Sequence, residues 1–274
     1  MRIDVDRWPE LRAPVLVVAL SGWVDAGLAG AGAIAVLAEQ LDSARRFGRL
    51  ELGDVVDLQQ TRPTVKLVEG STREITWPKL ELIAGRAGRD VVLCVGPEPS
   101  LRWREFTAVV VDAARRLGVD RAVMLGGMPA VVSHRRPVTV LATATSPGLA
   151  QEAGAMRTDY AGPTGAQTVL QVALGEAGVP AVGLWAQVPH YVSGNPSPPA
   201  IRALLARLRE VAGVETRLGA LDEQSDEWVE RVESGLADRP DVAELVEAIE
   251  AGADDLPTGD ELASEIERFL RDEG

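Results

Sequence analysis

Continuous apolar runs of strand length alternate with helical segments through the first 213 residues. The first run, 15–20, is followed by a segment rich in Ala and Leu, 26–41, that lacks the alternation of a strand. Comparable runs recur at 91–95, 122–125, 138–143 and 181–186. Strands that are apolar on both faces are typical of a parallel sheet covered by its crossover helices. The pattern predicts an α/β fold with three layers, in which a mostly parallel, doubly wound sheet lies between two layers of helices.

Capping residues indicate where two of these helices begin and end. Residues 164–167, Thr-Gly-Ala-Gln, have the spacing of a capping box and open a helix that Gly178 closes. Ser197 as N-cap and Pro198 in the first turn open the next helix, which ends at Gly213. The α/β part therefore extends to Gly213.

An insertion with hairpin character lies between the first and second strand-helix units. Residues 65–70 and 72–77 alternate in polarity on either side of Gly70-Ser71. Alternation of this kind around a glycine turn predicts a β-hairpin. We expect the hairpin to project from the edge of the sheet.

The acidic residues are concentrated at the C-terminal end. Residues 218–274 contain 19 acidic residues and four arginines, whereas the preceding part has a net charge of +2. Apolar stripes and the positions of Pro240 and Pro257 predict three short helices here. The stripes are Leu221, Trp228 and Val232; Val242, Leu245 and Ile249; and Leu262, Ile266, Phe269 and Leu270. Since each stripe is too narrow for a core, we divide the chain into an α/β domain, 1–213, and an acidic helical tail, 218–274, that packs on it or on a neighbouring chain.

Charge and composition exclude several classes of partner. An acidic face repels phosphate backbones and anionic lipids, so we expect neither nucleic acid nor a membrane surface as a partner. No apolar run has the length of a membrane span, and residues 1–7 carry acids where a signal peptide would be apolar. The single cysteine, Cys94, lies in the apolar run 91–95, so no disulfide forms within the chain and the residue is expected to be buried. The expected location is the cytoplasm.

The sequence lacks the motifs of several common reaction centres. It contains no phosphate-binding P-loop and no G-x-S-x-G nucleophile motif. With two histidines, His134 and His190, far apart in sequence, no spacing suggests a zinc site. The glycine-rich segment 22–32 has the order G-x-x-G-x-G, which favours close packing of a helix on the sheet over dinucleotide binding. We therefore expect no metal and no cofactor, and we assign no catalytic residue.

The less common residues follow the predicted ends of the strands. The carboxyl ends of parallel strands form the edge at which open α/β sheets bind ligands. The candidate contacts for a ligand or partner there are Trp23, Asp25, Glu98, Gly126, Gly127, Met128, His190 and Tyr191. Each also has a structural interpretation, because glycine and proline are frequent in turns, Asp25 fits a helix cap, and Glu98 fits a partner of a helix dipole.

Four segments at these turns carry a family resemblance. They are 22–27, 126–129, 162–165 and, most specifically, Val188-Pro189-His190-Tyr191-Val192 followed by Asn195-Pro196-Ser197-Pro198-Pro199-Ala200. Together they resemble the proteasome assembly chaperone family, in its second-type, bacterial and archaeal branch. The resemblance implies a fold related to nucleoside phosphorylases and a homo-oligomer, which we take to be a trimer. It also implies proteasome α-subunits as partners, as in archaeal and eukaryotic relatives.

The C-terminal end departs from the pattern of that family. Relatives that dock on the proteasome often end in a hydrophobic-Tyr-X motif, whose terminal carboxylate enters a pocket between α-subunits. This chain ends in Phe269-Leu270-Arg271-Asp272-Glu273-Gly274, without a penultimate tyrosine. We therefore do not expect docking through that motif, and contact through another surface remains open.

Two functions are compatible with these residues. We favour a non-catalytic, protein-binding homo-oligomer of the assembly-chaperone kind, because reaction motifs are missing. The alternative is an enzyme of nucleoside phosphorylase or hydrolase type that uses Asp25, Glu98 and His190 at the strand ends. Such an enzyme needs arginines around its phosphate, and the candidates are Arg102, Arg104, Arg135 and Arg136. Convergence of these groups in a closed pocket would favour the enzyme. An open, shallow crevice would favour the binding protein.

Overall fold

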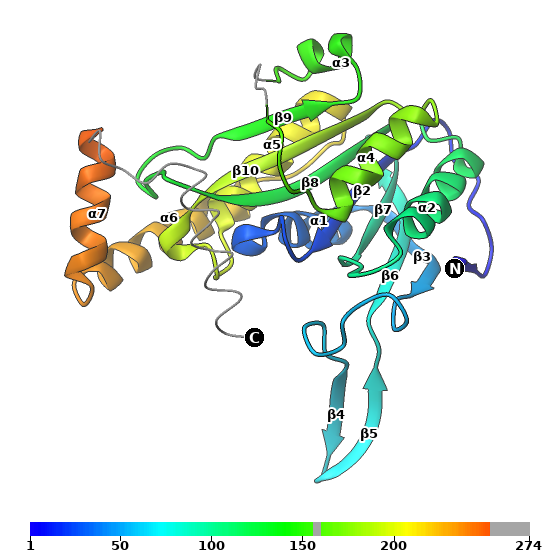
Figure 1. Ribbon diagram of the computed structural model, residues 1–274, viewed down its shortest axis with the longest axis horizontal. Coiled ribbons are helices and arrows are strands. Elements are labelled where there is room, and N and C mark those ends of the chain that lie inside the picture. Colours follow the sequence, from blue (N-terminus) through cyan, green and yellow to red (C-terminus); the bar gives the residue numbers. More distant parts are fainter. Residues whose placement is uncertain (156–159, 253–274) are drawn as a thin grey trace.

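The computed structural model describes residues 1–155 and 160–252. Its centre is one eight-stranded sheet with the strand order β1-β3-β6-β7-β2-β8-β10-β9 (Figure 1). The strands are β1 (Asp4–Val5), β2 (Val15–Ser21), β3 (Asp42–Glu51), β6 (Lys79–Ala87), β7 (Arg89–Pro97), β8 (Arg121–Ala130), β9 (Val140–Ala144) and β10 (Ala181–Pro189). The third helix predicted in the tail, from residue 258 onward, lies outside the described residues.

The sheet is mixed, with a parallel centre and antiparallel margins. Strands β7, β2, β8 and β10 run parallel to one another, as the apolar runs predict. Strands β6, β3 and β1 extend the sheet antiparallel on one side, and β9 does so on the other. Strands β1, β3 and β6 were not predicted from the sequence. The first five residues of β3 are exposed and four of them are polar, so this strand lacks the apolar run that marks a central strand.

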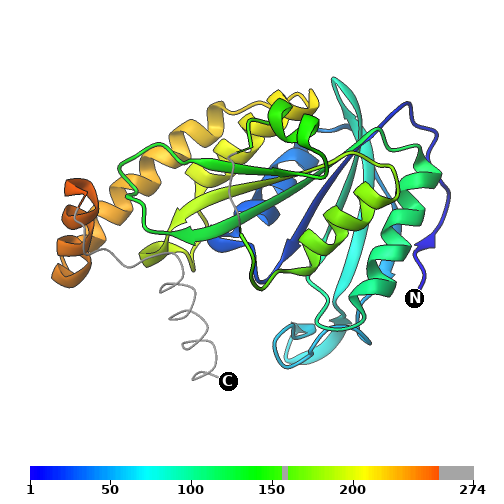
Figure 2. The same ribbon diagram turned by 45° about the horizontal axis from the view of Figure 1, so that its top comes forward.

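Helices cover both faces of the sheet, which confirms the α/β class. Helices α1 (Ala29–Gln40) and α5 (Pro198–Ala212) lie on one face. Helices α2 (Trp103–Leu117) and α4 (Ala166–Glu176) lie on the other (Figure 2). A short helix, α3 (Pro147–Glu152), follows the edge strand β9. None of the described helices is long and apolar enough to cross a membrane.

The alternation of side chains along β2 explains the two cores. Val15, Val17 and Ala19 pack in the cluster that contains residues of α1 and α5. Leu16, Val18 and Leu20 pack in the cluster that contains residues of α2 and α4. Successive side chains of a strand point to opposite faces, so one continuous apolar run supplies both layers. Cys94 is buried in this second core, as predicted, and burial raises the pKa of its thiol to about 12.

The start of α4 differs from the predicted capping box. The N-cap is Gly165, which has no side chain that could cap the helix. The glutamine of that motif, Gln167, is instead fully buried. Its side chain accepts a hydrogen bond from Leu20 N–H at 2.7 Å and donates one to the Leu125 carbonyl at 2.9 Å. Because the two backbone groups lie inside the sheet, pairing them outweighs capping a helix end.

Two further helices follow α5. Helix α6 (Gly219–Leu236) packs against α5 and buries Leu221 and Trp228. Helix α7 (Pro240–Ala251) begins at the predicted proline after three exposed residues, 237–239. Its fully buried side chain is Val246, which lies next to the predicted stripe. The helices predicted around these two stripes are therefore present.

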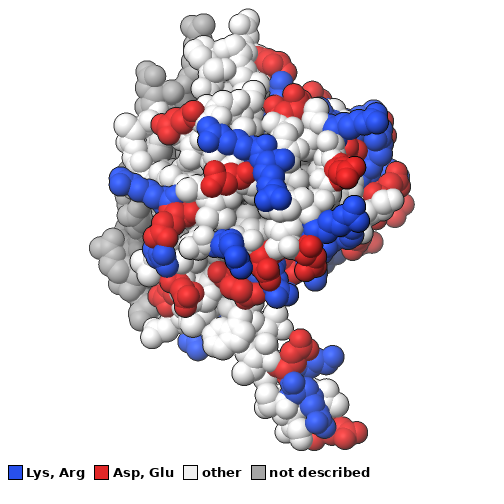
Figure 3. Space-filling model, turned by 90° about the vertical axis from the view of Figure 1, so that its right-hand side faces the viewer, with Lys and Arg blue, Asp and Glu red and all other residues white. Residues whose placement is uncertain are grey.

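The predicted hairpin stands away from the sheet. Strands β4 (Thr64–Val68) and β5 (Ser71–Thr76) pair only with each other, and all their residues are exposed. Glu69 and Gly70 form the turn, one position earlier than predicted, with φ angles of 50° and 75°. Figure 3 shows the hairpin projecting below a face on which positive and negative side chains are interspersed.

Candidate functional site at the carboxyl ends of the strands

The eight candidate residues follow or end the four parallel strands, at one edge of the sheet. Strand β2 pairs with β8 only as far as Val18 and Met124, so the two strands separate toward this edge. The separation leaves two backbone groups, Leu20 N–H and the Leu125 carbonyl, without a partner on the neighbouring strand, and the side chain of Gln167 binds both of them. It coincides with the point where the strand order changes direction, which is where open α/β sheets form their crevice.

The turn after β2 crosses closely over β8. Gly127 N–H donates a hydrogen bond to the Val24 carbonyl at 2.9 Å, and Asp25 forms an isolated bridge with Gly127. A Cβ on Gly127 would lie 2.1 Å from the Ala26 carbonyl oxygen. One on Gly126 would lie 2.5 Å from that of Val24. Both glycines therefore permit a close backbone approach.

Asp25 is buried beneath this turn, with 6% of its surface exposed. Its Oδ1 accepts hydrogen bonds from Gly30 N–H at 2.8 Å and Ala31 N–H at 3.3 Å, in the first turn of α1. Its Oδ2 is buried without a hydrogen-bond partner among the described residues. Burial raises the pKa of the carboxyl to about 6, against the opposing effect of the two N–H groups. The geometry is that of a helix cap, as the structural interpretation expects.

This burial predicts a pH-dependent stability. The carboxyl has a pKa of 3.8 when unperturbed and about 6 in the fold, so the folded state binds more protons between these values. Stability therefore falls as pH rises from about 4 to about 6. Asp25→Asn removes this titration, and we expect its stability relative to wild type to rise by about 2 kcal/mol between pH 4 and pH 7. Urea unfolding at several pH values measures this, and a constant difference would contradict it.

Glu98 and Trp23 are brought together by the structure. Glu98 Oε2 accepts a hydrogen bond from Trp23 N–H at 3.3 Å, and Oε1 accepts one from Ala166 N–H at the start of α4. The carboxylate thus joins the turn after β2 to a helix N-terminus, where negative charge is favourable. The indole of Trp23 remains 47% exposed at the edge of the sheet. Of this pair, Trp23 is the one whose side chain is available to a partner.

His190 and Tyr191 lie in the short 3-10 helix η2 (His190–Val192), directly after β10. His190 Nδ1 lies 3.2 Å from the Ala130 carbonyl and donates to it. Tyr191 turns toward a residue outside the predicted set, His134. Its hydroxyl accepts from the His134 backbone N–H at 3.0 Å and lies 2.8 Å from Nδ1, to which it donates. This arrangement leaves the ring proton of His134 on Nε2.

The loop 131–139, here called the strand-end loop, is tied to α6 and α7 by charged groups. His134 Nε2 lies 3.1 Å from Glu233 of α6. Arg135 contacts Glu233 at 2.6 Å and Glu247 of α7 at 2.7 Å. Arg136 contacts Glu250 of α7 at 2.7 Å. Arg135 and Arg136 were candidates for a phosphate site in the enzyme alternative, whereas the structure pairs both with carboxylates of the acidic segment.

These contacts change the pKa values of the groups involved. The Arg136 guanidinium lowers the pKa of Glu250 to about 2, and Arg135 lowers that of Glu233. Burial lowers the pKa of His134 and raises that of Tyr191. His134 is therefore held neutral, which suits the hydrogen bond that its Nδ1 accepts.

The attachment of α7 is nevertheless weak. The side chains of Arg136 and Glu247 are both about two-thirds exposed, so solvent and salt screen the ion pairs that they form with Glu250 and Arg135. Helix α7 is therefore held to the strand-end loop by ion pairs that are exposed to solvent on one side.

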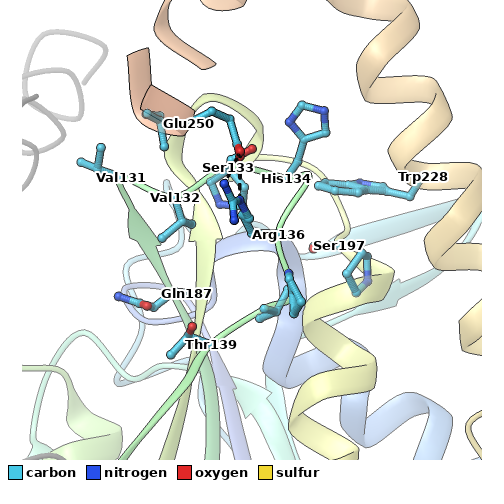
Figure 4. A pocket seen from close by; sticks show the side chains of 15 residues that line it. Val131, Val132, Ser133, His134, Arg136, Thr139, Gln187, Ser197, Trp228 and Glu250 are labelled. Atoms are coloured by element: carbon cyan, nitrogen blue, oxygen red, sulfur yellow. Dashed lines mark hydrogen bonds and ion pairs between the residues drawn. The ribbon is translucent and has the colours of Figure 1, made fainter. Parts of the chain in front are cut away.

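A pocket of about 250 Å³ lies between these helices and the sheet edge (Figure 4). It is bordered by the strand-end loop, the end of β10, the start of α5, and Trp228 and Ile249. Ser197 Oγ, at the N-cap of α5, lines this pocket and has no hydrogen-bond partner among the described residues, although Ser197 is only 1% exposed. The buried hydroxyl of Ser197 is therefore available in this pocket for a hydrogen bond.

The groups required by the enzyme alternative are held by separate partners. Asp25 caps α1, Glu98 meets the start of α4, and His190 donates to a backbone carbonyl. No hydrogen bond joins these three side chains within residues 1–155 and 160–252. In the same part of the chain, Arg102 pairs with Glu105, and no three His, Cys, Asp or Glu side chains are grouped to hold a metal ion.

Comparison with known proteins gives relatives of similar length and fold. A PAC2 family protein from Streptomyces avermitilis is 44% identical, with a TM-score of 0.77 over 85% of this chain and 99% of the other. A proteasome-assembly chaperone homologue from Mycobacterium tuberculosis is 40% identical, with a TM-score of 0.78 over the same shares. The archaeal proteasome activator PbaB from Pyrococcus furiosus is 20% identical, with a TM-score of 0.69 over 85% of this chain and 97% of its own, and shares the fold. No curated protein matched the sequence.

The family model confirms the resemblance found at the turns of the sequence. It matches residues 19–235, which include the end of β2, the parallel strands β7, β8 and β10, the turns that follow these strands, and nearly all of α6. The chain belongs to the PAC2 family.

Proposed function

We propose that the protein is a non-catalytic, assembly-chaperone-like homo-oligomer that binds proteasome subunits in the cytoplasm. Support comes from the PAC2 family and from relatives described as a proteasome-assembly chaperone homologue and an archaeal proteasome activator. We also propose that the chain consists of an α/β domain, 1–213, and an acidic helical tail, 218–274. The oligomer is proposed to be a trimer, and the fold to be related to that of nucleoside phosphorylases.

The observation that carries the proposal is the apolar face of the β4–β5 hairpin. By strand alternation and register, Val65, Leu67 and Ile75 share one face, and Trp77 continues the alternation of β5. All four side chains are more than half exposed. A lone two-stranded hairpin is marginally stable in water, and soluble proteins keep such grouped apolar surface for contact with other proteins.

Further apolar side chains are exposed after β2 and before α4. Trp23, Leu28 and Tyr160 are each at least 46% exposed, whereas the polar candidates Asp25 and Glu98 are engaged by backbone N–H groups. Exposed aromatic side chains beside occupied polar groups suit protein contact better than acid-base chemistry.

Charge placed on the apolar face of the hairpin should weaken self-association. We expect Ile75→Asp to raise the dissociation constant of the oligomer at least tenfold, because the carboxylate would be desolvated in the interface. Light scattering over a range of protein concentrations gives this constant. The control is Thr76→Asp on the opposite face, which adds the same charge. Equal dissociation constants for both variants and wild type, or a monomeric wild type, would contradict the assignment of this face to self-association.

The proteasome contact is tested separately with purified α-subunits from the same organism. We expect the full chain to bind α-subunits that have not yet formed rings, and surface plasmon resonance measures the affinity. Absence of binding at micromolar concentration would contradict the proteasome link. It would leave the result of the self-association measurement unaffected.

A further inference from the structure

The strand-end loop already holds an acidic helix. Arg135 and Arg136 bind Glu247 and Glu250, which lie one turn apart on α7. The helix presents carboxylates to the arginines, and the apolar Ile249 on the same helix lines the adjoining pocket. The contact shows which chemistry this surface recognises: an amphipathic helix with acidic residues at positions i and i+3.

Helix α7 fills this surface incompletely. A pocket of about 250 Å³ remains beside it, and Ser197 Oγ, which borders this pocket from the N-cap of α5, lacks a hydrogen-bond partner among the described residues. In Figure 4, Glu250 and Arg136 lie at one side of the pocket and Ser197 on the other. Buried polar groups without partners are uncommon in a contact shaped only for stability. The surface therefore has room and hydrogen-bonding capacity for a larger occupant than α7.

The connection of α7 to the rest of the chain permits its release. Only residues 237–239 join it to α6, and all three are exposed. The residues of α6 that the strand-end loop contacts, Glu233 and Trp228, precede this connection. Release of α7 would therefore leave α6 packed on α5 and Arg135 paired with Glu233, and would remove the carboxylate partner of Arg136.

We propose that the strand-end loop and the adjoining pocket form a docking site for an acidic amphipathic helix of a partner protein, which α7 occupies until the partner displaces it. The proposal deepens the proposed protein-binding function and rests on it. Because α7 is tethered to the same chain, it competes for the site at a high effective concentration. A partner helix therefore binds only when its binding free energy is large enough to displace α7. The site thus binds acidic helices of high affinity and excludes those of low affinity.

A fluorescent peptide of residues 240–251 is the probe for this site. In the full chain, E247K/E250K places lysines opposite Arg135 and Arg136 and repels the tethered helix. We expect this variant to bind the peptide at least tenfold more tightly than wild type in fluorescence anisotropy. We also expect hydrogen exchange in residues 240–251 to increase. Adding R135A/R136A to this variant should abolish the peptide binding.

The control variant is E223K/E244K, which makes the same change of charge at two exposed residues that form no ion pair in the described part of the chain. We expect it to bind the peptide as wild type does. Equal peptide affinities for both double variants would overturn the proposal, as would unchanged exchange protection of α7 in E247K/E250K. If R135A/R136A instead dissociates a wild-type oligomer, the occupant is α7 of a second copy, and the assignment to a partner protein is wrong. None of these readouts requires proteasome binding, so failure here and failure of the proteasome link are distinguishable.

Discussion

Replacement of Gly127 by alanine should lower the free energy of unfolding by about 4 kcal/mol. The added Cβ would lie 2.1 Å from the backbone oxygen of Ala26, which no side-chain rotation can relieve. The turn after β2 would have to move, and the hydrogen bond from Gly127 N–H to the Val24 carbonyl would be lost with it. Thermal unfolding should show a decrease of roughly 10 °C in Tm.

The matched control for this substitution is Gly53→Ala. A Cβ at Gly53 has no heavy atom within 4 Å, so we expect a change within about 0.5 kcal/mol. Equal stability of the two alanine variants would mean that the turn does not cross β8 as closely as described. It would also reopen a contact role for Gly126 and Gly127, which the sequence analysis proposed and to which the structure gives a packing role.

Replacement of Gln167 by leucine should destabilise the protein by about 3 kcal/mol, although the two side chains have similar volumes. The change leaves Leu20 N–H and the Leu125 carbonyl buried without partners, at the point where β2 and β8 separate. Urea unfolding measures this loss: the midpoint of the transition should fall, while the dependence of the unfolding free energy on urea concentration should stay the same.

A second variant at this position separates hydrogen bonding from packing. Gln167→Glu keeps an acceptor for Leu20 N–H but directs a carboxylate oxygen at the Leu125 carbonyl, so we expect its stability to improve when the pH is lowered. Gln224→Leu, at an exposed position of α6, is the control for adding an apolar side chain. A leucine variant as stable as wild type would show that the buried hydrogen bonds of Gln167 make no net contribution.

The candidate site was predicted in part because its location follows from local patterns. Continuous apolar runs identified the parallel strands, and the residues after them necessarily lie at one edge of the sheet. The partners of those residues could not be predicted in this way. Glu98 meets the start of α4, 68 residues away in sequence, and Arg136 meets Glu250 across 114 residues. Opposite charge in the sequence suggests that Arg136 pairs with a carboxylate of the tail, but it does not show which of the tail carboxylates is the partner.

The sequence by itself determined the α/β class, the parallel centre of the sheet, the projecting hairpin and the family. These features depend on periodicity, glycine turns and short motifs, all of which act within about ten residues. Tertiary structure alone decided the antiparallel margin, the role of Gln167 and the docking of α7. Strand β3 has a polar, exposed first half that pairs through its backbone, so its side chains carry little signal. Gln167 and Arg136 acquire their partners only when strands and helices distant in sequence are packed together, because a buried or charged group is paired by whichever complementary group the fold brings within hydrogen-bond distance.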